Sequence, residues 1–176
     1  NVFKDFCGNK VRIDGYVNNA AVAYDDIVTN LNLERLKAMY NVNVFTPMMM
    51  TKNVIRNMLL HKTKGSIVHI SSISVHTGYK GLAMYASSKG ALEAFSKDTA
   101  REWGVIGIRS NVVVPGFMAT AMSSTLTDEQ RDKIYARTSL KAATSIRSVA
   151  ETVTFLLSDK AESITGQNIH VDNGTI

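Results

Sequence analysis

The chain has 176 residues, which is the size of one domain with room for a sizeable core, so residues 1–176 are treated as a single domain. The formal net charge is +5 and 45% of the residues are hydrophobic, a composition that excludes collagen-like and disordered proteins. One cysteine and four scattered histidines cannot build a disulfide scaffold or a metal cluster.

The same counts bear on partners and compartment. Lysine and arginine are spread along the chain with no block of five like charges, which argues against nucleic-acid binding. No run of 18 apolar residues is present, so no membrane span is expected. The single cysteine favours the reducing cytoplasm.

Four short β-rich runs alternate with longer helical patterns along the chain. The expected strands are residues 13–18, 66–70, 109–114 and 168–171, and the expected helices are residues 31–60, 85–103 and 148–157. A shorter helix is expected to begin at Thr127, where Thr-Asp-Glu-Gln fits a capping box. The alternation predicts an α/β fold, a doubly wound parallel sheet of the Rossmann-like type, with about four strands.

Small and polar residues follow three of these strands. The first run ends in Asn18-Asn19-Ala20-Ala21, the second in Ser71-Ser72-Ile73-Ser74 and the third in Pro115-Gly116-Phe117. Since the carboxyl ends of parallel strands share one edge of the sheet, and open α/β sheets bind ligands there, these segments predict a cleft. Any one of them alone could equally be an ordinary turn.

Tyr85 and Lys89 form the first chemical pattern. Their i, i+4 spacing puts a phenol and an ammonium on one face of a helix. The positive charge is expected to lower the pKa of Tyr85 from about 10 and make it a usable proton donor or acceptor. Ser72, just past a strand, could meet the Tyr85 hydroxyl across a substrate carbonyl, although a loop-start serine can simply bond its own backbone.

Pro47 is the second clue. It has no N–H to give to the carbonyl of Asn43, four residues earlier, so a kink with a free carbonyl is expected, available to a water or to Lys89. A mere bend of the helix around the core explains Pro47 equally well.

With these motifs in order, the chain resembles the classical short-chain dehydrogenase/reductase family over essentially its whole length. The residues that carry the resemblance are Asn18-Asn19-Ala20-Ala21, Asn43, Ser72, the segment YASSK from Tyr85 to Lys89, Pro115-Gly116, Thr120, and the tail Ile164-Thr165-Gly166 with Val171-Asp172-Asn173-Gly174. Within the family, the segment from Pro115 to Thr120 and the tail look most like 3-oxoacyl-[acyl-carrier-protein] reductases.

The resemblance implies a role for each matched residue. Tyr85 would be the general acid in carbonyl reduction, and Lys89 would hold the nicotinamide ribose and lower the pKa of Tyr85. Ser72 would orient the carbonyl, and Asn43 would hold a water that links Lys89 to solvent. The cofactor site would be lined by Asn18, Ala20, Tyr85, Lys89, Pro115, Gly116 and Thr120.

The resemblance also exposes departures from the family pattern. Ala21 and Asn173 stand where the family usually has glycine, and the Gly-rich loop after a first strand is absent from the sequence. The family's first mononucleotide half would precede Asn1, so the residues that select NAD or NADP cannot be read, with NADP the first expectation. The strand at residues 13–18 is then expected to be a bare sheet edge.

The implied reaction reduces a ketone to a secondary alcohol with NADP or NAD as cofactor. Met84, Met118 and Met122 suit an adaptable apolar pocket for an acyl thioester, although they may be core residues. An acidic acyl carrier protein could dock on basic residues, or these could be solvated helix faces. The residues are Lys80, Arg131, Lys133, Arg137 and Lys141.

The family usually forms tetramers through its two long helices, so a homotetramer or homodimer is expected. Val54, Met58, Leu92 and Phe95 are the interface candidates, with the core as their alternative location. Two other functions remain open: an alcohol, sugar or steroid dehydrogenase of the same family, and a non-catalytic scaffold that has lost cofactor binding. The complete set of Asn43, Ser72, Tyr85 and Lys89 argues against the scaffold.

Overall fold

A computed structural model describes residues 11–120 and 126–176, and Met122 lies outside the described residues. Its four strands form one parallel sheet in the order β1-β2-β3-β4. The strands are β1 (Gly15–Asn18), β2 (Ser66–Ile70), β3 (Arg109–Pro115) and β4 (Asn168–Val171). The predicted α/β doubly wound fold is therefore confirmed, and each strand begins and ends within two residues of its predicted bounds. As expected, β1 lies at an edge of the sheet.

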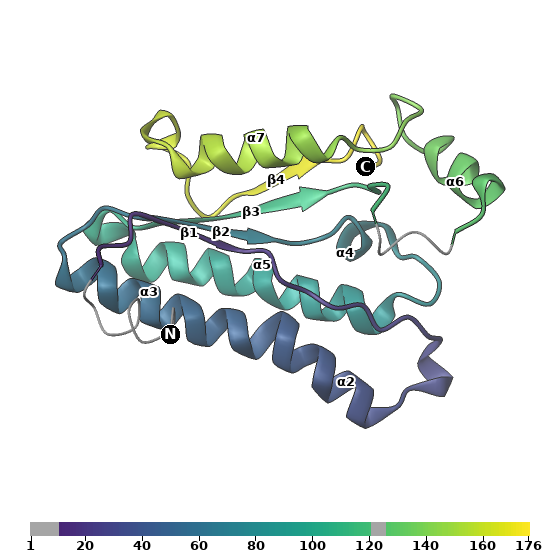
Figure 1. The fold of residues 1–176 in the computed structure, drawn as a ribbon, viewed down its shortest axis with the longest axis horizontal. Helices are drawn as coiled ribbons and strands as arrows, with labels where there is room; N and C mark the ends of the chain where they lie inside the picture. The colour runs from purple at the N-terminus through teal and green to yellow at the C-terminus, as the bar shows by residue number, and fades with distance from the viewer. Residues whose placement is uncertain (1–10, 121–125) are drawn as a thin grey trace.

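The helices cover both faces of the sheet (Figure 1). One layer holds α2 (Leu33–Tyr40), α3 (Thr46–Leu60) and α5 (Ala83–Trp103), and α7 (Ile146–Leu157) covers the opposite face. The shorter helices are η1 (Val28–Asn30), α4 (Ser74–Thr77), η3 (Gly104–Ile106), α6 (Asp128–Tyr135) and η5 (Asp159–Ala161). Thr127 caps α6 with the predicted capping box.

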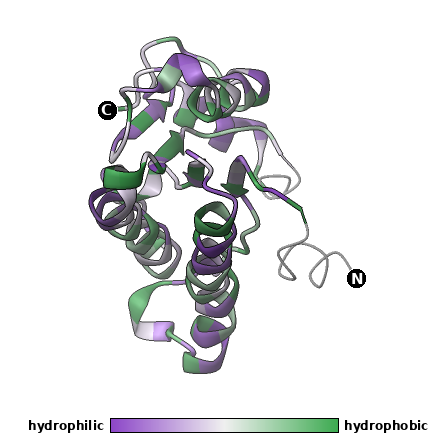
Figure 2. Ribbon diagram, turned by 90° about the vertical axis from the view of Figure 1, so that its left-hand side faces the viewer, coloured by the Kyte–Doolittle hydropathy of each residue, from purple (hydrophilic) through white to green (hydrophobic). Residues whose placement is uncertain are grey.

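The sheet is buried on both sides because successive residues of a strand point to opposite faces. Ile67 packs with Val54 and Met58 of α3, whereas its neighbour Val68 packs with Leu156 of α7. Seen end on, the strands between the two helix layers are largely hydrophobic (Figure 2). The packing of the sheet between two helix layers therefore fixes the positions of the strand ends.

The long helix predicted at residues 31–60 differs from expectation. It is divided by a π-helical turn, η2 (Asn41–Phe45), in which the Thr46 N–H donates to the Asn41 carbonyl. Pro47 lies at the start of α3, directly after this wider turn. Because a proline has no N–H, the chain accommodates it with a π-turn directly before it, a detail that the sequence did not suggest.

Three of the four interface candidates belong to the core, which corrects that expectation. Val54, Met58 and Leu92 are at most 3% exposed, because each points from its helix toward the sheet. Phe95 is half-buried and packs its ring edge-on against His69. The exposed apolar residues of this helix layer are Val28, Leu31, Leu33, Val42, Phe45, Met49, Leu59 and Leu60.

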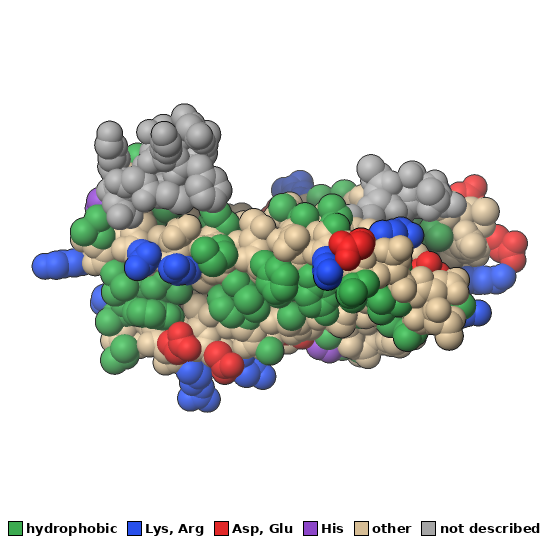
Figure 3. Space-filling model, turned by 90° about the horizontal axis from the view of Figure 1, so that it is seen from below, with side chains coloured by type: hydrophobic (Ala, Val, Ile, Leu, Met, Phe, Trp, Pro, Cys, Tyr) green, Lys and Arg blue, Asp and Glu red, His purple; other side chains and the backbone are tan. Residues whose placement is uncertain are grey.

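Apolar side chains are spread over the surface of the layer that contains α2 and α3 (Figure 3). Among the described residues, none of the helices combines the length and the apolar character needed to cross a bilayer.

Candidate active site

The carboxyl ends of the strands meet at one edge of the sheet, as predicted, beside α4 (Figure 1). Backbone hydrogen bonds hold the segments that follow the strands together at this edge. The N–H of Ser71 donates to the Val113 carbonyl, that of Ile73 to the Pro115 carbonyl, and that of Gly116 to the Val171 carbonyl. The edge is therefore a fixed frame for the side chains described below.

Gly116 shows how closely the chain packs at this frame. A Cβ atom on Gly116 would lie 2.7 Å from the Asp172 Cα atom and 2.5 Å from the Thr144 Oγ1 atom. Since Asp172 would be met at its backbone, a side chain at position 116 would push the β3 and β4 ends apart. The Pro115-Gly116 pair thus keeps the edge compact.

Tyr85 and Lys89 lie on the first turns of α5 and on the same face of it. The Lys89 Nζ atom stands 5.8 Å from the centre of the Tyr85 ring. Lys89 is 2% exposed and donates a hydrogen bond of 2.8 Å to the Ile70 carbonyl at the end of β2. The i, i+4 pair predicted from the sequence is therefore present, and it faces the strand ends.

Ser72 completes the arrangement from the segment after β2. The Ser72 side chain is close enough to Tyr85 to lower the pKa of the phenol. The Ser72 Oγ atom also accepts from Ser74, from its N–H at 3.2 Å and its hydroxyl at 2.9 Å. Two hydroxyls and an ammonium thus converge at one point of the sheet edge.

The pKa of Tyr85 differs from the expectation that Lys89 would lower it. Burial raises the pKa of the phenol above its ordinary value, the Ser72 hydrogen bond lowers it, and the charge of Asp25 raises it further. Desolvation of the phenolate is the largest of these effects, so the ordinary state of Tyr85 is the protonated phenol. Burial also lowers the pKa of Lys89, to about 8.

Asn43 acts through its side chain. Its amide nitrogen donates to the Val22 carbonyl at 2.8 Å and to the Ser88 hydroxyl at 3.1 Å, and its amide oxygen accepts from the Val22 N–H at 2.9 Å. The fully buried amide therefore fastens the segment after β1 to the π-turn and to α5 beside Lys89. The ammonium itself donates to Ile70, not toward the proline bend.

Asn18 is at the strand edge, but its side chain points into the protein. It accepts from the Tyr16 hydroxyl at 2.7 Å, and its amide nitrogen lies 3.1 Å from Thr51 Oγ1 and 3.0 Å from His69 Nδ1. Ala20 and Thr120 are exposed on the segments that follow β1 and β3. Asn18 therefore anchors β1 from inside the protein and does not present its side chain at the edge.

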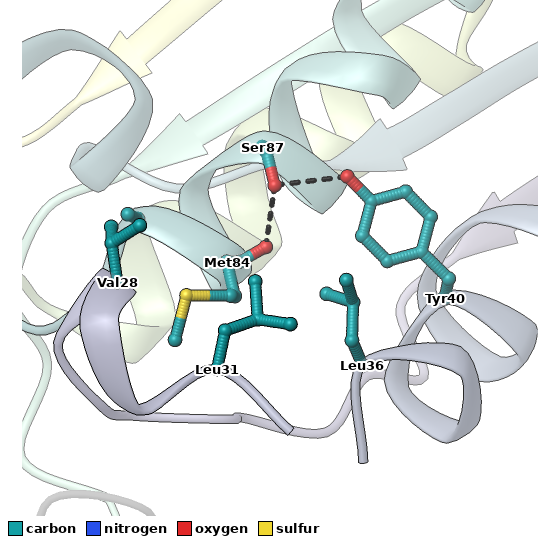
Figure 4. Close-up of a pocket in the computed structure, with 7 residues that line it drawn as sticks. Val28, Leu31, Leu36, Tyr40, Met84 and Ser87 are labelled. Carbon is teal, nitrogen blue, oxygen red and sulfur yellow. Dashed lines mark hydrogen bonds between the residues drawn. The ribbon is translucent and has the colours of Figure 1, made fainter. Parts of the chain in front are cut away.

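A hollow of about 200 Å³ lies between the start of α5 and residues 28–40 (Figure 4). Its lining includes Leu31, Leu36 and Met84, and the Tyr40 hydroxyl donates to Ser87 at its rim. Met84 is only 4% exposed, so this methionine is chiefly a core residue. Tyr85 packs against the same apolar cluster as Leu36 and Tyr40, so the hollow adjoins the cluster that also supports the Tyr85 ring.

Sequence reasoning overlooked three residues around the site. Ser74 donates to Ser72, the charge of Asp25 acts on Tyr85, and Glu93 lies buried one turn beyond Lys89. Ser74 had a signal in the sequence as part of the polar segment after the second strand, and Glu93 had one because Tyr85, Lys89 and Glu93 repeat at four-residue intervals on one helix face.

Comparison with known proteins agrees with this geometry. Residues 1–175 match the family model described as enoyl-(acyl carrier protein) reductase. The 3-oxoacyl-[acyl-carrier-protein] reductase of Buchnera aphidicola subsp. Baizongia pistaciae is 34% identical over 98% of this chain and 69% of its own length. That of Escherichia coli K12 is 36% identical over 92% of this chain and 66% of its own length.

Solved structures agree as well. A 4-hydroxyisoleucine dehydrogenase complexed with NADH superimposes with a TM-score of 0.93 and 28% identity, over 99% of this chain and 72% of that one. A putative gluconate dehydrogenase from Agrobacterium tumefaciens gives a TM-score of 0.92 and 26% identity, over 98% and 69% of the two chains. The chain belongs to the short-chain dehydrogenase/reductase family. It is an NAD(P)-dependent oxidoreductase.

The described residues fit the nicotinamide end of such a cofactor. An ammonium has three N–H groups, and the hydrogen bond from Lys89 to Ile70 uses one of them, so Lys89 can also bind ribose hydroxyls. Tyr85 and Ser72 lie beside it, and the Pro115-Gly116 backbone closes the edge without side-chain bulk.

Proposed function

We propose that this enzyme reduces the ketone of a 3-oxoacyl thioester to a secondary alcohol, with NADPH as the preferred reductant. The observation that carries the proposal is the convergence of Ser72, Tyr85 and the buried Lys89 at one edge of the sheet. The 3-oxoacyl reductases at 34% and 36% identity support the thioester as substrate.

In the proposed reaction the Ser72 and Tyr85 hydroxyls both donate to the carbonyl oxygen and orient the ketone. When bound, a reduced nicotinamide would supply the hydride for the carbonyl carbon. Tyr85 gives its phenolic proton to the oxygen, which completes the alcohol and leaves a phenolate. Because the pKa of Tyr85 is raised, the phenol is fully protonated at neutral pH and ready to donate.

Lys89 binds the nicotinamide ribose in this proposal. With a pKa of about 8 it is mostly charged at neutral pH, and its Nζ atom stands 5.8 Å from the centre of the Tyr85 ring. Asn43 holds the segment after β1 against α5, directly beside Lys89. In alcohol oxidation the steps reverse, with Tyr85 as the base.

The acyl carrier would meet basic residues near the site. Arg131 and Lys133 are weak candidates, because each pairs with an acidic neighbour on α6, Asp128 at 3.2 Å and Glu129 at 2.6 Å. Lys80 and Arg137 are exposed. We assign the contact with an acidic carrier to these two residues, with Met118 beside the apolar part of the acyl chain.

Substrate assays with the full-length protein test the proposal. We expect turnover of 3-oxoacyl thioesters with NADPH, and slower turnover with NADH. Lys80→Glu with Arg137→Glu should raise KM for the carrier-bound thioester at least fivefold and leave KM for a small thioester unchanged. A preference for simple alcohols, sugars or steroids would contradict the thioester as the substrate. If the protein bound neither NADPH nor NADH, a non-catalytic scaffold would be favoured.

We also propose that the enzyme acts in the cytoplasm as a homotetramer or homodimer that packs through the layer containing α2, α3 and α5. Exposed Val28, Phe45 and Met49, together with the apolar hollow beside Met84, support this surface as the interface.

A further inference from the structure

Glu93 is a buried carboxylate on the catalytic face of α5. It lies four residues beyond Lys89 and eight beyond Tyr85, so the three side chains form one stripe along the helix. Glu93 is 8% exposed, and a carboxylate in that position must be well hydrogen-bonded to be tolerated. The partners of Glu93 therefore show what it holds.

The partners of Glu93 come from three different elements. Its Oε1 atom accepts from the Ser71 hydroxyl at 2.5 Å and lies 3.1 Å from His76 Nε2. Its Oε2 atom accepts from the Asn168 amide at 2.7 Å. One side chain thus ties α5 to the end of β2, to α4 and to β4.

Two of these contacts bracket Ser72. Ser71 immediately precedes Ser72, and His76 lies on the short helix whose first residue, Ser74, donates to the Ser72 hydroxyl. Glu93 therefore contacts residues 71–76, which we call the serine turn, at both the first and the last residue. Since Glu93 shares a helix with Tyr85, the same contacts connect the position of the serine hydroxyl with that of the phenol.

We propose that Glu93 is a positioning residue that sets the Ser72 hydroxyl opposite Tyr85 through Ser71 and His76. Asn168 provides an internal control, because it donates a hydrogen bond to the same carboxylate from β4 and not from the serine turn. If Glu93 only stabilised the fold, the loss of any of its three contacts would have the same effect on kcat. If Glu93 positions Ser72, loss of a contact with the serine turn lowers kcat, whereas loss of the contact with Asn168 does not.

The experiment measures kcat, KM and thermal stability for variants of the full-length enzyme. Glu93→Ala and Ser71→Ala should lower kcat at least tenfold while KM for the nicotinamide stays within twofold, since Lys89 and its bond to Ile70 remain. Glu93→Gln keeps an acceptor for Ser71 and should restore kcat to within about threefold of the parent. Asn168→Ala should lower the melting temperature but leave kcat within twofold.

Equal kcat losses in Ser71→Ala and Asn168→Ala, or a normal kcat in Glu93→Ala, would overturn the positioning role. The proposal rests on the function assigned to Ser72 and Tyr85, so Tyr85→Phe is measured in parallel. If Tyr85→Phe is inactive and Glu93→Ala is normal, only the positioning role fails. If Tyr85→Phe itself remains active, the proposed function fails first.

Discussion

Lys89 is an ammonium almost without access to water, and this has a consequence for stability. Burial lowers its pKa from 10.5 to about 8, so between these values the unfolded chain binds more protons than the folded one. The stability of the folded protein therefore rises with pH across this window, and the full cost of burying the charge applies below pH 8.

The first prediction concerns Lys89→Met. At pH 7 the variant should be more stable than the parent by roughly 2 kcal/mol, because about 3 kcal/mol of desolvation is removed and about 1 kcal/mol of hydrogen bonding to Ile70 is lost. The gain should shrink as pH rises from 8 to 10.5. Urea unfolding at pH 7 and pH 10 measures it, with Lys97→Met, an exposed lysine of the same helix, as the control. An equal gain at both pH values would contradict the prediction.

The buried His69 side chain determines how stability changes at the acidic end of the pH range. Burial, with the charge of Lys89, lowers its pKa from 6.5 to about 4, and its Nδ1 atom accepts from Asn18. Between pH 6.5 and 4 the unfolded chain holds more protons, so stability should fall by roughly 3 kcal/mol as pH drops through this window. His69→Asn should weaken the dependence of stability on pH in this window, whereas His61→Asn should leave that dependence unchanged. An unchanged dependence in His69→Asn would show that other groups cause the acid sensitivity.

At the scale of elements, the π-turn Asn41–Phe45 places the Asn43 amide where it pairs with both backbone groups of Val22. Asn43→Ala should lower stability by about 2–3 kcal/mol, because a fully buried amide loses its hydrogen bonds to Val22 and Ser88. The amide proton of Val22 should also exchange faster. Hydrogen exchange with urea unfolding tests this, and Asn41→Ala, exposed on the same turn, is the control. Unchanged exchange at Val22 would exclude this role of Asn43.

Elements were predictable from the sequence where local pattern decides them. The strands and the capping box at Thr127 follow from alternation and spacing, and the Tyr85 and Lys89 pair follows from helix geometry. The π-turn could not be predicted, because Pro47 signals only a missing N–H and not how the chain accommodates it. The raised pKa of Tyr85 also depends on burial, which spacing alone does not reveal.

At the scale of the whole molecule, tertiary packing decides which apolar helix residues remain outside. Val54, Met58 and Leu92 share the helical spacing of an interface but face the sheet, whereas Phe45 and Met49 are more than half exposed. A helix stripe read from sequence cannot tell these faces apart when both are apolar. The Glu93 contacts with β2, α4 and β4 were hidden for the same reason, since they join distant parts of the chain.

The exposed face predicts the behaviour of an assembly variant. Phe45→Glu should shift the protein to a smaller oligomer, because a carboxylate would be buried in the interface. Light scattering after size exclusion measures the mass. Val105→Glu, which changes a residue 90% exposed on η3, should leave the mass unchanged. An unaltered oligomer in Phe45→Glu would place the interface elsewhere.

The central claim is that Tyr85 donates the proton to the substrate oxygen beside Ser72 and Lys89. Tyr85→Phe removes one hydroxyl and little packing, so the melting temperature should stay close to that of the parent while kcat falls by about 10²–10⁴-fold. Tyr40→Phe, which removes a hydroxyl that donates to Ser87, is the matched control and should keep its activity. The decisive measurement is kcat of folded Tyr85→Phe with a ketone substrate and saturating NADPH. Loss of turnover is the predicted result, and near-normal turnover would contradict the account.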